Sequence, residues 1–266
     1  VTAAEAVDYV RQSDYDEWVV EERLVGEEFT IQAFVANGAL RATPAVQDHK
    51  RAYEGDEGPN TGGMGSYSDT TRTLPFMTEK DYDRAVGILQ AVVDAMADYE
   101  GVLYGQFMLT ADGPKVVEFN ARFGDPEATN TLLTLETPLL DVLTAARDVD
   151  SLPELSFAPT ATVCKYAVPE GYPTDPDGGS RITVDEESAG GATLFYASVD
   201  ERDDGIYTTT SRSLAVVGTG ETIAAAEAKA SNALAAAGDG LRYRSDVGTA
   251  ALVQRRIDHV AGLRGE

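Results

Sequence analysis

Three polar residues on two neighbouring segments could together bind a hard metal ion. Glu118 and Asn120 are two positions apart in KVVEFNARF, and Gln106 lies in the preceding segment VLYGQFMLT. Positions i and i+2 of a strand project from the same face about 7 Å apart, and a hairpin would place Gln106 beside them. Carboxylate and amide oxygens suit Mg²⁺ together with water and phosphate oxygens. The spacing therefore predicts a divalent metal site, with a solvated sheet face as the alternative.

A second set of polar residues precedes a glycine-rich stretch. In QDHKR, Lys50 and Arg51 could neutralise a phosphate, Asp48 could orient an amine, and His49 could do either. GPNTGGMGSYSD follows at residues 58–69, and its glycines permit positive φ and close approach of a ligand to the backbone. Because residues 48–69 show neither helical nor strand periodicity, we expect a mobile loop that covers a binding site. The alternative is a disordered surface loop with solvated charges.

Segments rich in β-branched residues predict two antiparallel units that would carry these residues. The first is a meander of strands at residues 18–24, 29–37 and 39–47, with a type I′ turn at Asn37-Gly38. The second is a hairpin of residues 102–110 and 115–123. In its second strand one face should pack in the core, and the other should face a catalytic site or water. The expected core face consists of Val117, Phe119, Ala121 and Phe123, opposite Glu118, Asn120 and Arg122.

Two helical stretches accompany these strands. Residues 78–100 predict a helix because apolar side chains recur at spacings of three and four, namely Tyr82, Val86, Leu89, Val93 and Met96. In GDPEATNTLL, Asp125 is expected to cap a second helix whose first turn holds Pro126 and Glu127. Pro138 should break or kink that helical stretch, which ends near Arg147.

The second half of the chain predicts a smaller α+β domain. Residues 148–159 lose periodicity and contain two prolines, so we place a domain boundary there. Beyond it we expect strands at 160–168, 192–199 and 212–220, and an alanine-rich helix at 222–238 that begins after Thr222. The segment that holds His259 is charged, and we expect this histidine to be exposed. Nothing in this half indicates catalysis by itself.

Composition narrows the class of protein. The chain has 266 residues and a formal net charge of −24, with its acidic residues scattered throughout, which argues against nucleic acid or an anionic membrane as a partner. A dispersed acidic excess also indicates a high-salt cytoplasm, with an ordinary acidic protein as the alternative. The single cysteine, Cys164, fits a reducing cytoplasm and a buried position. Walker-type phosphate loops, zinc-binding clusters and serine-hydrolase elbows are absent from the sequence.

In order along the chain, three motifs resemble those of the phosphoribosylamine–glycine ligase family. They are VVEERLVGEEFTIQAFV, QDHKRAYEGDEGPNTGGMGSYS and KVVEFNARFGDPEA, and the likeness continues through PEGYP, FYASV and LRYRSDVG. The resemblance implies an α+β ATP-grasp fold, with the C-terminal lobe and part of the central lobe in residues 1–150. Residues 151–266 would then form a small α+β C-terminal domain.

The resemblance also implies a reaction and its cofactors. Glycine's carboxylate would attack the γ-phosphate of ATP, with Mg²⁺ or Mn²⁺ present, and 5-phosphoribosylamine would then displace phosphate from glycyl phosphate. We expect a cytoplasmic monomer that has these small molecules as its partners. A related ATP-grasp carboxylate–amine ligase and a non-catalytic nucleotide-binding fragment remain as alternatives.

The resemblance assigns roles residue by residue. Arg122 would meet the acyl phosphate or glycine's carboxylate, Asp125 would meet glycine's ammonium group, and Lys50 joins them as a catalytic candidate. The metal ligands would be Gln106, Glu118 and Asn120. The adenine and ribose of ATP would lie on Glu21, Glu22, Leu24 and Glu28. The amine substrate would be held by backbone N–H groups of the glycine loop, with the candidates Asp48, His49, Pro59, Asn60, Thr61, Gly62, Gly63 and Met64.

Two departures from the family pattern affect these expectations. Family members carry an N-terminal domain and a glycine-rich, lysine-containing loop before the region matched here, whereas this sequence starts at Val1. We therefore expect a truncated chain that lacks part of its ATP site. The segment KYAVPEGYP is longer than the GGYP-type version of many bacterial members, which leaves open what Lys165 and Tyr172 contribute.

Overall fold

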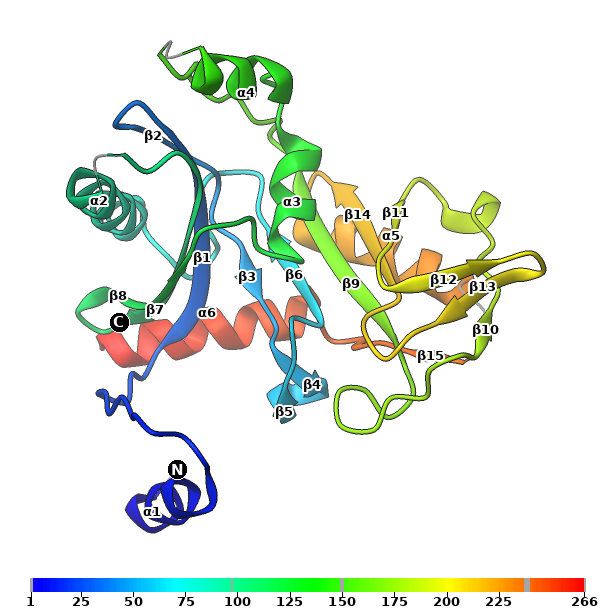
Figure 1. Cartoon of the computed structure of the whole chain (residues 1–266). Helices are drawn as coiled ribbons and strands as arrows, with labels where there is room; N and C mark the ends of the chain where they lie inside the picture. Colours follow the sequence, from blue (N-terminus) through cyan, green and yellow to red (C-terminus); the bar gives the residue numbers. More distant parts are fainter. Residues whose placement is uncertain (1, 97, 149–150, 237–239, 266) are drawn as a thin grey trace.

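A four-stranded antiparallel sheet carries most of the residues singled out above. In this computed structural model, which describes residues 2–96, 98–148, 151–236 and 240–265, the sheet has the order β2-β1-β7-β8 (Figure 1). Its strands are β1 (Glu27–Ala36), β2 (Ala39–Ala42), β7 (Gly101–Thr110) and β8 (Gly113–Asn120). The predicted turn between β1 and β2 is confirmed, since Asn37 and Gly38 have φ of 53° and 73°.

The predicted strand at residues 18–24 is wrong. These residues form no strand, and the side chains of Val19 and Val20 are 83% and 93% exposed. Their β-branched composition favours extended backbone, but no described segment pairs with them to complete a ladder. The preceding helix α1 (Ala3–Gln12) begins with a capping box between Thr2 and Glu5, and it projects away from the sheets (Figure 1).

The predicted helix over residues 78–100 is confirmed as α2 (Glu79–Ala95). Thr78 caps it through the N–H of Asp81, and the Asp81 carboxylate accepts the N–H of Thr78 in return. Tyr82, Leu89 and Val93 of the predicted apolar stripe are buried in the main core, whereas Met96 lies at the C-cap and is 40% exposed. Residue 97 lies outside the described residues. This helix packs on the four-stranded sheet and holds β7 and β8 in place.

The predicted hairpin of β7 and β8 is confirmed, but its expected core face is not. Val117 and Phe119 are 40% and 39% exposed. The physical reason is a bulge: Gln106 lies opposite Glu118 while Phe107 lies opposite Val116, so Val117 is left without a partner. The extra residue interrupts the alternation, and Val117 therefore turns toward the same hollow as Glu118.

A second, larger sheet contains strands from both halves of the chain. Its order is β11-β14-β9-β6-β3, with β15 on the far end of β9. The strands are β3 (Gln47–Asp48), β6 (Gly65–Ser68), β9 (Ala161–Pro169), β11 (Thr193–Tyr196), β14 (Leu214–Gly220) and β15 (Leu241–Arg242). The three strands predicted in the second half are thus confirmed. Helix α5 (Ile223–Ala236) packs on β9 and β14, and Thr222 caps it through the N–H of Ala225.

The stretch 48–69 is ordered, contrary to the expected structureless loop. It contains β6 and a small hairpin of β4 (Arg51–Tyr53) and β5 (Glu57–Asn60), joined through the 3-10 turn η1 (Glu54–Asp56). These strands are too short to show periodicity. Strands β4 and β5 pair with each other. Strand β6 forms because it lies between β3 and β9, a pairing that joins residues far apart in the sequence.

Asp125 does not cap the following helix, which corrects the prediction. Helix α3 (Glu127–Thr134) has Pro126 at its N-cap, after a cis Asp125-Pro126 bond, and no side chain caps it. Asp125 instead turns its carboxylate toward the second sheet, where Tyr166 donates to it. The break at Pro138 is confirmed, because a separate helix α4 (Leu139–Arg147) starts there. The helical stretch ends at Arg147 as predicted.

The remaining elements complete the second half. A three-stranded sheet has the order β10-β13-β12, with β10 (Arg181–Ile182), β12 (Val199–Arg202) and β13 (Gly205–Thr208), and η2 (Glu187–Ala189) is a 3-10 turn. The C-terminal helix α6 (Ala250–Arg264) was not predicted; its buried Leu252 and Val260 lie among charged residues such as Arg255, Arg256 and Asp258. It runs back across the first sheet and contacts β1 and β7 (Figure 1). Within the described residues, no helix has the length and apolarity to cross a bilayer.

Candidate functional site

The three metal-ligand candidates lie together on the open face of β7 and β8. The register sets Gln106 opposite Glu118, as the hairpin predicted, and the Asn120 side-chain amide donates to Glu118 Oε1 at 3.1 Å. Gln106 is buried, while the Glu118 side chain is 52% exposed. These residues therefore offer one carboxylate and two amide groups at the edge of a solvent-filled hollow.

Two further side chains extend this cluster. Lys50 Nζ lies 2.5 Å from Gln106 Oε1 and 4.0 Å from Glu118 Oε1. The Gln106 amide nitrogen donates to Glu28 Oε2 at 2.8 Å. Gln106, Glu118 and Asn120 fit a hard cation that retains water and phosphate oxygens, because all three offer oxygen ligands and Glu118 is accessible. No group of three His, Cys, Asp or Glu side chains in the described ranges could hold a metal by itself.

The candidates for adenine and ribose line a hollow of about 400 Å³ beside this cluster. Its lining consists of Glu21, Glu22, Leu24 and Glu28 together with Met108, Lys115, Val116 and Val117. Lys115 Nζ and Glu22 Oε2 form an ion pair at 3.0 Å, which joins the irregular N-terminal segment to β8. The hollow has an apolar wall and a charged rim, as a flat heterocycle on a ribose would require.

A second hollow of about 580 Å³ adjoins the first and contains the QDHKR residues. Glu28, Met108 and Val117 line both hollows, while Asp48, His49, Lys50 and Arg51 line the second. Gln106 and Glu118 lie on its wall. Gln106 and Glu118 therefore line the second hollow next to the residues that it shares with the first, whereas Asn120 lines neither hollow.

Three backbone N–H groups of the glycine loop, which the sequence suggested as a cradle for the amine substrate, are already hydrogen-bonded within the protein. The N–H groups of Thr61 and Met64 donate to the carbonyls of Lys50 and His49, both at 2.8 Å. The Gly63 N–H donates to the Thr61 hydroxyl at 3.0 Å. Those three donors are therefore unavailable to a ligand, and the Met64 side chain is buried among apolar residues. Pro59 and Asn60 are exposed at the tip of β5.

Two carboxyl groups beneath this loop interact with each other. Burial raises the pKa of Asp48 well above its ordinary value, and the Glu127 carboxylate adds to the increase. Burial also raises the pKa of Glu127, which accepts a hydrogen bond from the Tyr104 hydroxyl at 2.8 Å. Sequence reasoning treated Glu127 only as a residue of a first helical turn. The burial of Glu127 results from the packing of β6, β7 and α3, which local sequence does not reveal.

Arg122 and Asp125 lie on the loop after β8. Arg122 is exposed, and its Nη1 donates to the Phe123 carbonyl at 2.8 Å. Asp125 accepts from the Tyr166 hydroxyl at 2.7 Å and from Arg212 Nη2 at 3.0 Å, and its side chain remains 52% exposed. Each carboxylate oxygen has a further lone pair, so Asp125 can still accept from an incoming ammonium group. Tyr166 and Arg212 were missed because no local motif marks them.

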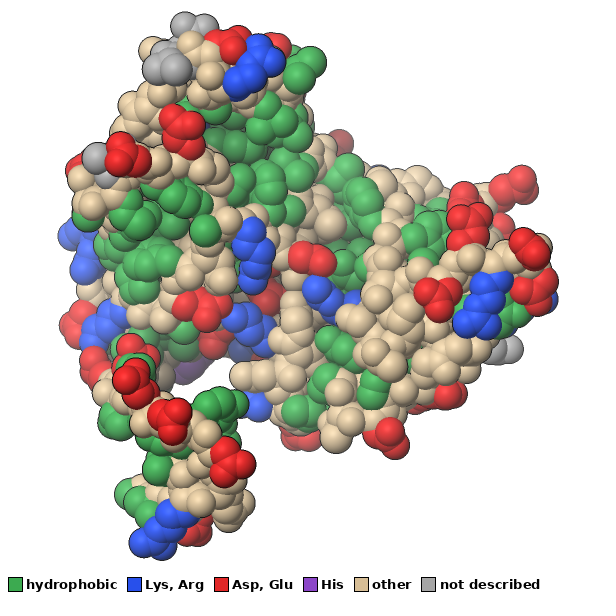
Figure 2. Space-filling model, viewed as in Figure 1, with side chains coloured by type: hydrophobic (Ala, Val, Ile, Leu, Met, Phe, Trp, Pro, Cys, Tyr) green, Lys and Arg blue, Asp and Glu red, His purple; other side chains and the backbone are tan. Residues whose placement is uncertain are grey.

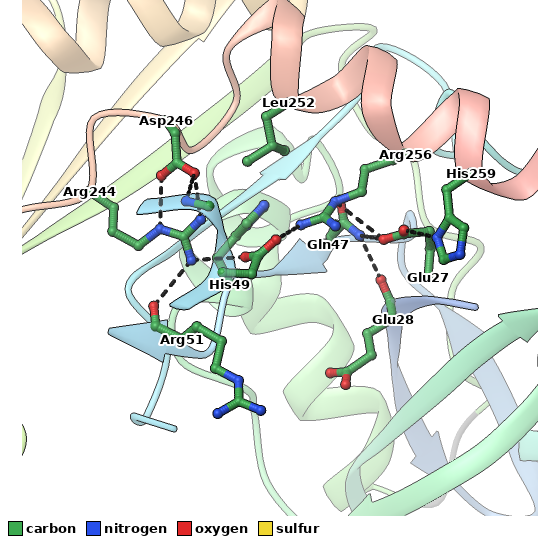
Figure 3. Close-up of polar contacts among 12 residues, drawn as sticks. Glu27, Glu28, Gln47, His49, Arg51, Arg244, Asp246, Leu252, Arg256 and His259 are labelled. Carbon is green, nitrogen blue, oxygen red and sulfur yellow. Dashed lines mark hydrogen bonds and ion pairs between the residues drawn. The ribbon is translucent and has the colours of Figure 1, made fainter. Parts of the chain in front are cut away.

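His49 is buried and both its ring nitrogens lack a hydrogen-bond partner in the described structure. Burial lowers its pKa to about 3, and Arg244 and Arg256 contribute to the decrease. Figure 3 shows Arg244 and Arg256 on either side of this histidine, where they pair with Asp246 and Glu27. The imidazole is therefore neutral and can donate one hydrogen bond from one ring nitrogen and accept one at the other.

Four other residues from the sequence analysis lie outside the two hollows or have structural contacts. Lys165 is buried and donates to Glu227, Ser231 and the Ser245 carbonyl at 2.6 to 2.8 Å. Tyr172 and Cys164 are buried in one apolar cluster, and burial raises the pKa of the Cys164 thiol to about 12. The predicted burial of Cys164 is confirmed. His259 is 42% exposed, which confirms the expectation of an exposed histidine, and it contacts Glu27.

Acidic side chains are distributed over the visible face of the molecule in Figure 2 and do not gather in one patch. The scattered pattern agrees with a net charge of −24 that arises along the whole sequence. No surface of this face has the basic stripe that a nucleic-acid interface would need.

Two family models match the chain. Residues 3–128 match the model described as phosphoribosylglycinamide synthetase, ATP-grasp (A) domain, and residues 162–250 match phosphoribosylglycinamide synthetase, C domain. The two matches follow each other in the chain and together take in most of it. They include the metal-ligand candidates and Arg212.

Curated relatives agree with these matches. The phosphoribosylamine–glycine ligase of Methanosarcina barkeri is 56% identical over 254 residues, which is 93% of this chain and 58% of that protein. The same enzyme of Methanocella arvoryzae is 50% identical over 272 residues, covering 99% of this chain and 62% of that protein. The chain thus spans less than two thirds of the length of these relatives.

Solved structures show the same fold. The crystal structure of phosphoribosylamine–glycine ligase from Thermotoga maritima aligns with a TM-score of 0.74 at 30% identity, over 85% of this chain and 56% of that one. The biotin carboxylase domain of Hydrogenobacter thermophilus 2-oxoglutarate carboxylase aligns with a TM-score of 0.62 at 11% identity, over 90% and 51%. At that identity the second likeness concerns the fold alone.

Proposed function

Because this chain belongs to the phosphoribosylglycinamide synthetase family, we propose that the protein joins glycine to 5-phosphoribosylamine at the expense of ATP. A carboxylate oxygen of glycine attacks the γ-phosphorus of ATP, the bond to the β,γ-bridging oxygen breaks, and ADP leaves. The amine of phosphoribosylamine then attacks the carbonyl carbon of glycyl phosphate and expels phosphate, with loss of one proton. The products are glycinamide ribonucleotide, ADP and phosphate.

The observation that carries this proposal is the group of Gln106, Glu118 and Lys50 in the second hollow, next to the residues Glu28, Met108 and Val117 that it shares with the first. Adenine and ribose in the first hollow would place the triphosphate beside these shared residues. A divalent cation, when bound by Gln106, Glu118 and Asn120, supplies charge neutralisation on the transferred phosphoryl group. Mg²⁺ and Mn²⁺ both suit these oxygen donors.

The protein's own side chains then position the reactants. Lys50 contributes a positive charge within 4.0 Å of Glu118, where phosphate oxygens would approach. We assign Arg122 to the carboxylate or acyl phosphate end of glycine, since it is the exposed cation on the loop that leaves β8. We assign Asp125, with Asp48 behind it, to glycine's ammonium group. Phosphoribosylamine would enter along the glycine loop and use side chains such as Asn60 and His49 more than backbone donors.

The family matches also support a division of the chain into residues 1–150 and 151–266, because one match ends at residue 128 and the next begins at residue 162. We propose that the protein is a monomer in the cytoplasm, with small molecules as its partners. The scattered charge in Figure 2 supports an adaptation to high salt.

The test measures ADP release by the complete reading frame that contains these residues, in molar KCl. ADP release that requires both glycine and freshly generated phosphoribosylamine would support the ligase. Release with glycine and a different amine would indicate a related carboxylate–amine ligase. ATP binding without ADP release would indicate a nucleotide-binding protein that does not catalyse.

Substitution of a metal-ligand candidate tests the site within that assay. Glu118→Ala should lower Mg²⁺-dependent turnover by a factor on the order of a hundred or more, because it removes the carboxylate of the set. The circular dichroism spectrum should be unchanged, since the side chain is 52% exposed. Glu201→Ala, an exposed acidic residue on β12, is the matched control. Turnover in Glu118→Ala equal to that of the control would remove the metal assignment.

A further inference from the structure

Arg212 joins two segments that the proposed function assigns to different substrates. It lies between β13 and β14, in the second half of the chain. Its Nη1 donates to the Gly62, Gly63 and Asp125 carbonyls at 2.8, 3.1 and 2.9 Å, and its Nη2 donates to Asp125 Oδ2 at 3.0 Å. One guanidinium thus bonds both to the glycine loop and to the loop before α3.

The guanidinium has little freedom to move. Its side chain is 15% exposed, and its Cζ lies 4.4 Å above the centre of the Tyr166 ring. The Tyr166 hydroxyl donates to the other oxygen of Asp125. Arg212 and Tyr166 therefore hold one carboxylate from two sides while they stack on each other.

Gly62 and Gly63 lie so close to neighbouring groups that a side chain at either position would crowd them. A Cβ at Gly62 would lie 3.3 Å from Arg212 Cζ. A Cβ at Gly63, where φ is +109°, would lie 2.6 Å from Pro126 Cδ and 2.8 Å from Asp48 Oδ1. Because the glycines of TGGMG have no Cβ, the backbone carbonyls can reach Arg212 and the loop can pack against the cis Asp125-Pro126 segment.

The two attachments of Arg212 differ in what else supports them. Asp125 keeps its bond from Tyr166 if the arginine is lost. Among the hydrogen bonds of the described residues, the Gly62 and Gly63 carbonyls accept only from Arg212. Loss of the guanidinium should therefore leave these two carbonyls without a donor and let the middle of the loop shift, while the Thr61 and Met64 N–H groups still hold its ends and Tyr166 still holds Asp125.

We propose that Arg212 is a positioning residue that sets the separation between the amine substrate on the glycine loop and the glycyl group near Asp125. This inference rests on the ligase activity proposed above. It concerns the second chemical step, in which the amine must reach the acyl carbon before water does. A displacement of about 1 Å can cost on the order of a hundredfold in such a step.

The test is the yield of glycinamide ribonucleotide per ADP released, measured for Arg212→Met and Arg212→Lys in the complete reading frame. We expect Arg212→Met to retain glycine-dependent ADP release while the yield falls about tenfold, because unprotected glycyl phosphate hydrolyses. Arg212→Lys keeps the charge but loses the forked geometry, so its yield should lie between those of Arg212→Met and wild type.

Arg41→Met is the matched control. Arg41 also donates to two backbone carbonyls, those of Leu40 and Leu152, and pairs with Glu154 at 2.8 Å, but it lies away from the hollows of the site. Its yield should equal that of wild type. Tyr166→Phe removes only the hydroxyl bond to Asp125, and we expect it to raise the KM for glycine with little change in yield.

The outcomes separate the inference from the function on which it rests. Absence of ADP release in wild type would refute the ligase itself. An active wild type with equal losses of ADP release and product in Arg212→Met would show a structural role and overturn the inference. An unchanged yield in Arg212→Met would overturn it as well. If Arg212→Met does not fold, the yield of Arg212→Lys decides: a wild-type value refutes the inference.

Discussion

Arg244→Met should strongly destabilise the protein. Arg244 is 1% exposed and donates to Asp246 at 2.8 and 2.7 Å, to Asp56 at 3.0 Å and to the Arg51 carbonyl at 3.1 Å. It therefore ties the segment before α6 to the β4–β5 hairpin (Figure 3). Removal of one partner from a buried ion pair costs about 3–5 kcal/mol, because the remaining charge stays desolvated.

The structure places the expected loss at the lower end of that range. Asp56 would still pair with Arg256, and Asp246 would still accept the Gly55 N–H at 3.0 Å. We therefore expect about 3 kcal/mol, which with an m-value of about 3 kcal/mol/M lowers the urea midpoint by about 1 M. The measurement is urea unfolding followed by far-ultraviolet circular dichroism at constant salt.

Arg202→Met is the matched control because it removes the same charge from an acidic protein. Arg202 is 49% exposed and lies 3.6 Å from Asp200, so its loss should cost about 0–1 kcal/mol. Equal midpoints for Arg244→Met and Arg202→Met would refute the reasoning. That result would mean that the buried network contributes no more than an exposed pair.

Three other predictions follow from particular contacts and from the charge. Gly63→Ala should destabilise the protein by about 3 kcal/mol, because φ is positive there and the new Cβ would contact Pro126. Gly38→Ala is the control and should cost about 1 kcal/mol, because nothing lies within 4 Å of its Cβ. Equal urea midpoints for the two variants would contradict this prediction. His49 has its pKa lowered to about 3, so the stability that its neutral form contributes is complete above the unfolded value of 6.5 and is lost as pH falls toward 3. Wild type should then lose about 1.4 kcal/mol more than His49→Gln for each pH unit below 6.5, and parallel unfolding free energies would refute this. The melting temperature should rise as KCl approaches molar concentrations, because salt screens the repulsion within a net charge of −24. A melting temperature that stays constant or falls with KCl would show that this repulsion does not limit stability.

Local signals in the sequence determined several elements correctly. The Asn37-Gly38 turn, the capping residue Thr222 and the break at Pro138 act within a few residues of the chain. Strand alternation also placed Glu118 beside Asn120, and hairpin pairing placed Gln106 beside both. Short-range geometry governs each of these features, so it can be read without knowledge of distant contacts.

Long-range contacts decided the rest. Residues 18–24 have the composition of a strand but no partner, and β6 is too short to be recognised until β3 and β9 pair with it. The bulge that turns Val117 toward the hollow leaves no mark in composition. Helix α6 was missed because charged residues such as Arg255, Arg256 and Asp258 lie among its apolar ones, and its burial depends on contacts with the distant strands β1 and β7.

By itself the sequence determined which side chains could bind a cation and a phosphate, because that choice depends on residue type and on spacing within one hairpin. Only the tertiary structure brought Arg212 and Tyr166 to Asp125, and Glu127 close to Asp48. Arg212 is separated from Gly62 by 150 positions and from Asp125 by 87. Such distances leave no periodicity to detect, and only the pairing of strands from both halves in one sheet brings these groups within hydrogen-bonding distance.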